Sequence, residues 1–158
     1  MILVCLGNIC RSPMAEVVLT QALKEAGLDG RVAVRSAGTG DWHLGEGMDV
    51  RAQAALADRG YDPSRHRARH LEADWFAEDD LILVMDSANL RDVTSTAPTS
   101  ADRSRIRMFR ASDPDAVGDL DLPDPWYGGQ DAFEQVLDTL ERTADALVEQ
   151  LRLTIDSA

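Results

Sequence analysis

The sequence predicts an α/β fold with three layers, in which helices cover both faces of a central four-stranded parallel sheet. Four short apolar runs alternate along the chain with segments in which apolar residues recur at helical spacing. The chain has 158 residues, the length of one ordinary domain, and neither an internal repeat nor a linker divides it. We therefore expect a single domain over residues 1–158.

The expected strands are short and rich in aliphatic residues. They cover residues 2–5, 32–34, 81–85 and 106–109. Ligands in parallel α/β sheets bind at the carboxyl ends of the strands. The loop that follows the first strand therefore leaves the sheet where the fold expects a site.

Two segments are expected to be loops rather than helix or strand. Residues 36–40 have the sequence Ser-Ala-Gly-Thr-Gly, and residues 111–129 carry five aspartates and three prolines. Acidic side chains in such a loop are usually only solvated, so composition alone gives none of these aspartates a catalytic role.

Three helices are predicted between the strands. The first begins at Ser12, a good N-cap residue, has Pro13 at its first helical position and ends at Gly27. The second is expected over residues 49–59 and the third over residues 87–93. Each predicted helix joins one strand to the next, which is the arrangement that a parallel sheet requires.

The last helix has the clearest pattern in the chain. Apolar residues recur along one stripe from Phe133 to Leu151, so we expect this face to pack against the core. Asp131 and Glu134 resemble a capping box at its start.

The acidic balance of the chain limits its partners. Aspartate and glutamate number 28 against 16 lysines and arginines, and the net charge of −12 disfavours nucleic acid and anionic membranes. A site for phosphate would need a local positive charge, for which Arg11 and the basic segment 65–70 are the candidates. No apolar run reaches the length of a membrane span, and Met1 runs directly into the first expected strand, so we expect a cytoplasmic protein.

Only two cysteines are present, Cys5 and Cys10. Two cysteines cannot build a disulfide framework, and the three histidines are too scattered to complete a zinc site, which takes about four ligands. We therefore expect no metal and no cofactor. Both cysteines lie in one short turn that ends at Arg11, which argues against two inert core residues.

The turn has the layout of a phosphate-binding loop with a sulfur nucleophile at its base. Cys5 and Arg11 stand at its two ends in a C-x5-R pattern, and inward-turned backbone N–H groups form an anion nest to which the helix start adds its dipole. Gly7 permits close approach of the backbone, and Asn8 tolerates a left-handed conformation. A Cys5 thiolate facing a bound phosphoryl group is a nucleophile, and the Ser12 hydroxyl can hydrogen-bond it. The residues expected to surround the phosphate are Leu6, Gly7, Asn8, Ile9 and Cys10.

These residues carry a resemblance to a known family. Residues 4–16, Val-Cys-Leu-Gly-Asn-Ile-Cys-Arg-Ser-Pro-Met-Ala-Glu, closely resemble the active-site signature of low-molecular-weight protein tyrosine phosphatases of the bacterial type. Further blocks that resemble the family follow in its order: residues 36–43, 66–69, 85–86, 89–91 and 124–128. The resemblance spans nearly the whole chain and implies the family's flavodoxin-like fold and its hydrolysis of phosphotyrosine.

The resemblance also implies a role for each motif residue. Cys5 would attack phosphorus and form a phosphocysteine, while Arg11 and the loop amides would hold the equatorial oxygens. Asp124 matches the general acid that protonates the leaving phenolate and then activates the hydrolytic water. Ser12 would stabilise the Cys5 thiolate as the leaving group of the second step.

Supporting residues follow from the same resemblance. The family's hydrogen-bond network that rigidifies the loop is matched by Asn8, Ser36 and His66. The aromatic walls that grip the substrate ring are matched by Trp42, Trp126 and Tyr127. The residues alone leave alternatives open: Trp42 in the core, His66 on a solvated basic face, and Asp86 as a helix cap or a catalytic group.

Cys10 has two interpretations. It either packs beneath the loop or forms a reversible disulfide with Cys5 that protects the nucleophile from over-oxidation. The family precedent favours the protective role.

Rival functions remain for the same fold. An arsenate reductase would need further cysteines to relay a disulfide, and the chain has none beyond Cys10. A phosphoarginine phosphatase of the family carries a hydroxyl residue where Ile9 stands, and Ile9 suits an aromatic ring instead. A phosphotyrosine-binding module without turnover is a third possibility, although no motif residue is missing. The expected partners are phosphotyrosine-containing proteins and inorganic phosphate or other oxyanions at the loop, bound by a monomer.

Overall fold

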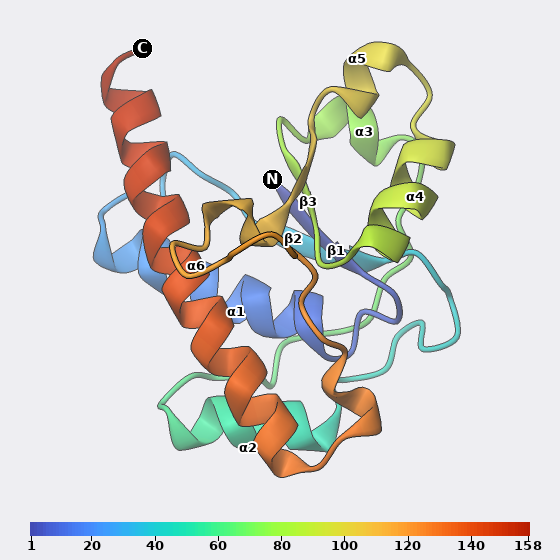
Figure 1. The fold of residues 1–158 in the computed structure, drawn as a ribbon, viewed down its shortest axis with the longest axis vertical. Coiled ribbons are helices and arrows are strands. Elements are labelled where there is room, and N and C mark those ends of the chain that lie inside the picture. The colour runs from blue at the N-terminus through green and yellow to red at the C-terminus, as the bar shows by residue number, and fades with distance from the viewer.

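A parallel sheet lies between two groups of helices in the computed structural model, which describes residues 1–158 (Figure 1). Its four strands stand in the order β2-β1-β3-β4, and all neighbouring pairs are parallel. They are β1 (Ile2–Cys5), β2 (Arg35–Gly38), β3 (Ile82–Val84) and β4 (Ile106–Met108). The expected fold class, a three-layer α/β/α arrangement around four parallel strands, is confirmed.

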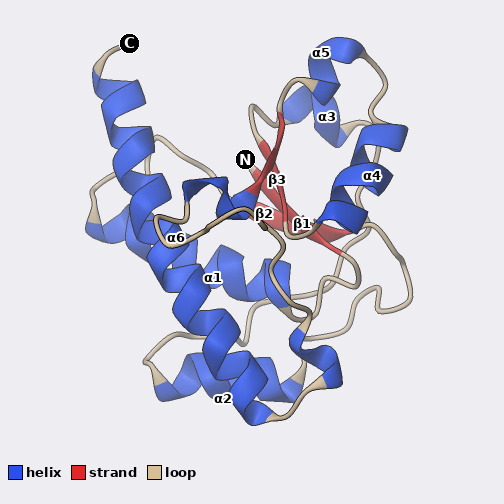
Figure 2. Ribbon diagram, viewed as in Figure 1, coloured by secondary structure: helices blue, strands red, loops and turns tan.

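Helices cover both faces of this sheet (Figure 2). On one side lie α1 (Arg11–Glu25), α2 (Val50–Asp58) and the long α6 (Gln130–Asp156). On the other side lie α3 (Trp75–Glu78), α4 (Ser87–Thr96) and α5 (Ser100–Arg103). Two short 3-10 turns, η1 (Phe109–Ser112) and η2 (Pro125–Tyr127), interrupt the segment between β4 and α6. No helix combines the length and the apolar character needed to cross a membrane.

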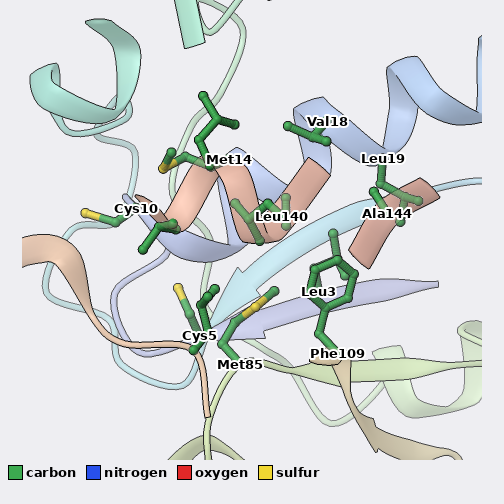
Figure 3. Close-up of a cluster of buried hydrophobic side chains, with 14 of the residues drawn as sticks. Leu3, Cys5, Cys10, Met14, Val18, Leu19, Met85, Phe109, Leu140 and Ala144 are labelled. Atoms are coloured by element: carbon green, nitrogen blue, oxygen red, sulfur yellow. The ribbon is translucent and has the colours of Figure 1, made fainter. Parts of the chain in front are cut away.

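Alternating side chains of β1 enter two separate cores. Leu3 and Cys5 belong to the core beneath α1 and α6, whereas Ile2 and Val4 belong to the core beneath α3 and α4. Because side chains of a strand alternate between the faces of a sheet, this pattern follows from the pleat. The last residue of β1, Cys5, is thereby directed to the same side as α1 (Figure 3).

The predicted strand over residues 32–34 is wrong, and the loop predicted over residues 36–40 is wrong for residues 36–38, whereas Thr39 and Gly40 do lie outside the strand. Strand β2 begins at Arg35 and pairs Arg35 with Ile2 and Gly38 with Cys5. The aliphatic residues before it form no strand: the Val32 N–H closes a turn on the Leu28 carbonyl, and Val32 and Val34 pack against the edge of the core beneath α1 and α6. Strand β2 instead has small buried residues, because the loop after β1 packs closely against its end.

The two predicted helix starts are also corrected. Helix α1 begins at Arg11 with Cys10 in the capping position, and Ser12 lies inside the first turn with its hydroxyl facing Cys5. Helix α6 begins after Gly129, which has no side-chain cap, so the expected capping box is absent. The predicted end of α1 is confirmed, since Gly27 adopts a positive φ of 71°. Helices α3 and α5 were missed because four residues carry no periodicity.

A buried carboxylate fixes the segment that leads from β4 toward α6. Asp113 accepts hydrogen bonds from Arg142 Nε (2.8 Å) and Arg142 Nη2 (3.1 Å) on α6, and from Arg110 Nε (3.0 Å) on its own segment. The hydrogen bonds from Arg142 hold the pKa of Asp113 well below its usual range. This brace ties the segment that ends at Asp124 to the longest helix.

We predict that Asp113→Asn lowers the free energy of unfolding by about 1–3 kcal/mol at pH 7, since it removes the charged acceptor of the three hydrogen bonds from Arg110 and Arg142. Because the pKa of Asp113 is lower in the folded than in the unfolded protein, its carboxylate contributes its full stabilisation above the unfolded pKa of about 3.9. This stabilisation is lost progressively as the pH falls from there toward the folded pKa. The difference from the wild type therefore shrinks in acid. Urea denaturation at pH 7 and at lower pH measures it.

The matched control is Asp115→Asn. Asp115 also lies near Arg142 (3.3 Å), but its side chain is 68% exposed, so a change of less than about 1 kcal/mol is expected. Equal losses in the two variants at pH 7 would contradict the buried brace.

Candidate active site

A pocket of about 180 Å³ opens at the carboxyl end of β1. Three segments that are distant in the sequence form it: the loop after β1, the segment before α2, and the segment around η2. The lining residues are Cys5, Leu6, Gly7, Ile9, Cys10, Arg11, Trp42, His43, Asp124, Trp126 and Tyr127. The site therefore lies at the edge of the sheet where a parallel α/β fold places ligands.

The Cys5 thiol sits at the base of this pocket. Cys5 Sγ lies 2.9 Å from Ser12 Oγ, and both residues are buried. Ser12 Oγ accepts a hydrogen bond from Asn8 Nδ2 (2.8 Å), and its single proton has two acceptors within reach, the nearer Cys5 Sγ and the Ala37 carbonyl at 3.4 Å. This arrangement stabilises a thiolate at Cys5.

The second cysteine has the opposite environment. Burial raises the pKa of the Cys10 thiol, and the negative charges of Asp49, Cys5 and Asp124 raise it further. Cys10 therefore stays a neutral thiol at neutral pH. Of the two sulfur atoms in the pocket, Cys5 is the one equipped as a nucleophile.

Arg11 supplies the positive charge. Its buried guanidinium donates from Nη1 to Asp86 Oδ2 (2.6 Å) and to the Leu122 carbonyl (2.9 Å). Asp86 Oδ1 accepts from the Asn89 N–H (2.7 Å) and caps α4. Asp86 thus performs the capping role that the sequence left open, and it also orients Arg11.

Asn8 stands at the centre of the loop's hydrogen-bond network. It adopts a left-handed conformation with φ 56°, the only non-glycine residue with positive φ. Its Nδ2 donates to Ser12 Oγ and to Ser36 Oγ (3.0 Å), while its Oδ1 accepts from the Arg69 N–H (2.9 Å). His66 Nε2 lies 2.6 Å from the Asn8 carbonyl, which can only accept, so Nε2 carries the proton.

The network continues beyond Asn8 into α1 and β2. Ser36 donates its hydroxyl proton to Glu16 Oε2 (2.9 Å) on α1. Gly38, at the end of β2, lies so close to the loop that a Cβ atom there would meet the Leu6 carbonyl at 2.6 Å. Only glycine permits this approach, which explains the glycine at the end of β2.

The basic segment 65–70 does not supply charge to the pocket, contrary to expectation. Its arginines line a separate groove together with Glu16 and Lys24. What the segment contributes to the site is hydrogen bonding to Asn8, through the His66 side chain and the Arg69 backbone. His66 is buried, so the solvated alternative for this side chain is wrong.

Aromatic side chains form the mouth of the pocket. Trp42 is 67% exposed, Trp126 48% and Tyr127 83%, so the alternative of Trp42 in the core is wrong. The Trp126 and Tyr127 rings meet edge to face, with centroids 5.1 Å apart. Exposed rings around a narrow pocket form apolar walls for a flat ligand.

Asp124 points its carboxylate into the same pocket. Asp124 Oδ1 accepts from the Trp126 N–H (3.1 Å), and Oδ2 lies 3.7 Å from Arg11 Nη2. The side chain is 29% exposed, so the carboxyl group is open to a ligand and to water. Pro125 begins the 3-10 turn and fixes the local backbone.

Arg51 anchors the segment that carries Asp124. Its Nη1 donates to the carbonyl oxygens of Trp126 (3.1 Å) and Gly128 (2.9 Å), and its guanidinium lies over the Phe133 ring at 4.6 Å. Asp49 pairs with Arg51 and caps α2. The start of α2 and the η2 turn are thereby held together across the pocket.

Comparison with known proteins now identifies the family. Residues 1–156 match the family described as low molecular weight phosphotyrosine protein phosphatase. A low molecular weight protein-tyrosine-phosphatase of Streptomyces coelicolor is 46% identical over 154 residues, which cover 97% of this chain and 93% of that protein. A low molecular weight phosphotyrosine protein phosphatase of Sus scrofa is 35% identical over 150 residues, which cover 94% of this chain and 93% of that protein. The chain belongs to this family.

Solved structures of the phosphatase family agree with the fold. A protein tyrosine phosphatase of Entamoeba histolytica with Hepes in its active site superposes with a TM-score of 0.91 at 31% identity, covering 97% of this chain and 96% of that one. The YwlE arginine phosphatase, solved with a phosphorylated active-site serine, superposes with a TM-score of 0.85 at 29% identity, covering 96% of this chain and 94% of that one. Because both share one fold, the fold alone does not choose between substrates, and the choice lies with the pocket walls.

Three residues of this phosphatase site escaped the sequence reasoning in whole or in part. Glu16 closes the network behind Ser36, and Arg51 anchors the η2 turn. Asp86 was recognised only as one of two alternatives. Glu16 stands inside the block of residues 4–16 that resembles the family signature, which is the signal that could have found it, whereas an arginine two residues after Asp49 carries no signal of a contact 75 residues away.

We predict that replacing Asn8 separates two contributions to the loop. Asn8→Ala loses the amide hydrogen bonds, at about 1–3 kcal/mol, and places alanine, which tolerates the left-handed region less well than asparagine, at φ 56°, at about 1 kcal/mol more. Asn8→Gly loses the same bonds without the backbone strain, so it is expected to be more stable than Asn8→Ala. Denaturant unfolding of both variants measures the difference. If both matched the wild type in stability, the network would not hold the loop.

Proposed function

We propose that this protein is a protein-tyrosine phosphatase that hydrolyses phosphotyrosine and other aryl phosphates through a phosphocysteine intermediate on Cys5. The observation that carries the proposal is the convergence of Cys5, Arg11 and Asp124 in one pocket with exposed aromatic walls. A nucleophile, a fixed cation and a carboxyl group within one narrow pocket are the groups that phosphate-ester cleavage needs.

In the first step Cys5 Sγ attacks phosphorus opposite the leaving oxygen. The sulfur–phosphorus bond forms, the bond to the phenolic oxygen breaks, and Asp124 in its protonated form gives its proton to that oxygen. Arg11 and the N–H groups of the loop hold the three remaining oxygens as negative charge spreads over them. Asp86 keeps the Arg11 guanidinium in orientation during this step.

In the second step water replaces the sulfur. Asp124, now a carboxylate, takes a proton from the water as its oxygen attacks phosphorus. The sulfur–phosphorus bond breaks, inorganic phosphate is released, and Cys5 leaves as a thiolate. The Ser12 hydroxyl, 2.9 Å from Sγ, stabilises that thiolate and so makes sulfur a better leaving group.

The pocket walls favour an aromatic ester over the rival substrates. Ile9 is an apolar lining residue beside the exposed aromatic side chains, and it offers no hydroxyl to a guanidinium group. The chain has two cysteines, so it cannot relay a disulfide outward as an arsenate reductase within one chain would. We also propose that residues 1–158 form one domain that acts as a cytoplasmic monomer on phosphotyrosine proteins, binds phosphate and other oxyanions at the loop, and contacts neither nucleic acid nor membrane.

We predict that Cys5→Ser abolishes turnover of p-nitrophenyl phosphate and phosphotyrosine while phosphate binding persists. Asp124→Ala is expected to slow phenyl phosphate about 10²–10⁴-fold, because its leaving group needs the proton, and to slow a substrate with a more acidic phenol far less. Steady-state kinetics at mildly acidic pH measures both effects.

The control for the acid is Asp115→Ala, an exposed aspartate of the same loop, which is expected to leave all rates unchanged. Phosphoarginine and arsenate are assayed beside the aryl phosphates. Faster turnover of phosphoarginine than of phosphotyrosine, or no hydrolysis of any phosphate ester by reduced wild-type protein, would overturn the proposal.

For Cys10 we propose the role of a redox guard. Mild peroxide converts the Cys5 thiolate to a sulfenic acid, and Cys10 then displaces water to form a disulfide that a dithiol reduces. We predict that the wild type recovers its activity after peroxide and dithiol, whereas Cys10→Ser recovers less with each longer exposure because Cys5 oxidises further. Equal recovery of the two proteins would show that Cys10 only packs beneath the loop.

A further inference from the structure

Most of the large apolar side chains that this protein exposes to solvent gather around one opening. Eight such side chains are exposed in the whole chain. Six of them are Leu6, Trp42, Leu44, Val50, Trp126 and Tyr127, and the other two are Val117 and Leu153. Single exposed apolar residues are ordinary on a protein surface, but a group of them at one place marks an interaction site.

Four of the six line the pocket itself, and the other two extend its rim. Leu44 directly follows the lining residue His43, in a turn closed by its own N–H to the Asp41 carbonyl. It is 57% exposed. An exposed leucine therefore follows the Trp42–His43 part of the pocket wall along the chain, between the exposed carboxylates of Asp41 and Glu46.

Val50 extends the rim on the side of η2. It is the first residue of α2 and is 77% exposed. The next residue, Arg51, donates to the carbonyl oxygens of Trp126 and Gly128, which fixes the start of α2 beside η2, as Figure 1 also shows. Val50 is therefore one residue away from the arginine that holds the backbone of Trp126.

We propose that this rim, Leu44 and Val50 together with the outer faces of the aromatic walls, binds large apolar side chains that flank the phosphotyrosine of a substrate protein. The inference rests on the proposed phosphatase function and names its substrate class. The occupant follows from continuity with the pocket: once the phosphorylated ring is inserted, an extended chain at about 3.3 Å per residue lays its next two or three residues over the rim.

The charge of the protein supports apolar flanks over acidic ones. A net charge of −12 repels a peptide that adds further negative charge to its phosphate. Leu44 and Val50 have no group that could pair with a charge of either sign. Burial of their aliphatic side chains against apolar partners is what these positions can contribute to binding.

The test compares phosphotyrosine peptides of one length whose residues on either side of the tyrosine are leucine, serine, lysine or glutamate. The wild type is expected to show the highest kcat/KM for the leucine peptide, about tenfold above the serine peptide. Leu44→Ser and Val50→Ser are each expected to lower kcat/KM for the leucine peptide about threefold to fivefold, with little change for the serine peptide. Turnover of p-nitrophenyl phosphate, which does not reach the rim, stays unchanged.

The controls are Val117→Ser and Leu153→Ser, the same chemical changes at the two exposed apolar residues away from the rim, which are expected to change nothing. Equal kcat/KM for the leucine and serine peptides, a preference for the lysine peptide, or equal losses in the rim and control variants would overturn the inference while the phosphatase function stands. Absence of turnover with every peptide and with p-nitrophenyl phosphate would instead overturn the function and the inference together.

Discussion

The side chain of Asn8 holds the catalytic loop in its shape, and the rest of the site depends on that hold. Its amide joins α1 through Ser12, β2 through Ser36, and the segment after α2 through the Arg69 backbone. Asn8, Ser12 and Ser36 are buried, where unmade hydrogen bonds are costly, so the loop has one favourable arrangement. The left-handed backbone at Asn8 is the strain that the network sustains. A loop fixed before substrate arrives spends no free energy on reorganisation during the reaction.

The fixed shape of the loop also explains how an acidic protein keeps a binding site for an anion. The net charge of −12 is spread over the surface, where salt screens it within about 8–10 Å. Inside the pocket the field comes from the buried Arg11 and the start of α1. Asp86 holds Arg11 in place at one end of the guanidinium, and Asp124 lies near the other. Cys10 adds no second negative charge, because burial keeps it a thiol.

The sequence predicted the parts of this molecule whose cause is local. Short-range sequence patterns mark the strand before Cys5, the C-x5-R turn and the apolar stripe of α6. The alternation of strand patterns with helix patterns predicts the fold class. Strand β2 was misplaced because its residues are small for a reason outside it: the loop lies against Gly38. A serine before a proline is usually a helix cap, whereas the Ser12 hydroxyl bonds Cys5 and Asn8 from inside the first turn of α1.

Contacts across long sequence distances were the least predictable. Arg51 reaches the η2 turn, Arg142 reaches Asp113, and neither spacing follows any periodicity. The basic segment 65–70 was predicted to face the phosphate because its charge is conspicuous, but its contribution to the site comes from one imidazole and one backbone N–H. Residue type predicted the chemistry of the site better than it predicted which neighbours would hold it.

The central claim is that the loop presents Cys5 as the atom that takes the phosphoryl group. Rapid acid quenching of the wild-type protein during turnover of p-nitrophenyl phosphate, followed by mass spectrometry of its peptides, tests this most directly. We predict one phosphoryl group on the peptide of residues 1–11, bound through Cys5. A phosphoryl group on another residue, or turnover with no phosphorylated peptide at any quench time, would contradict the account.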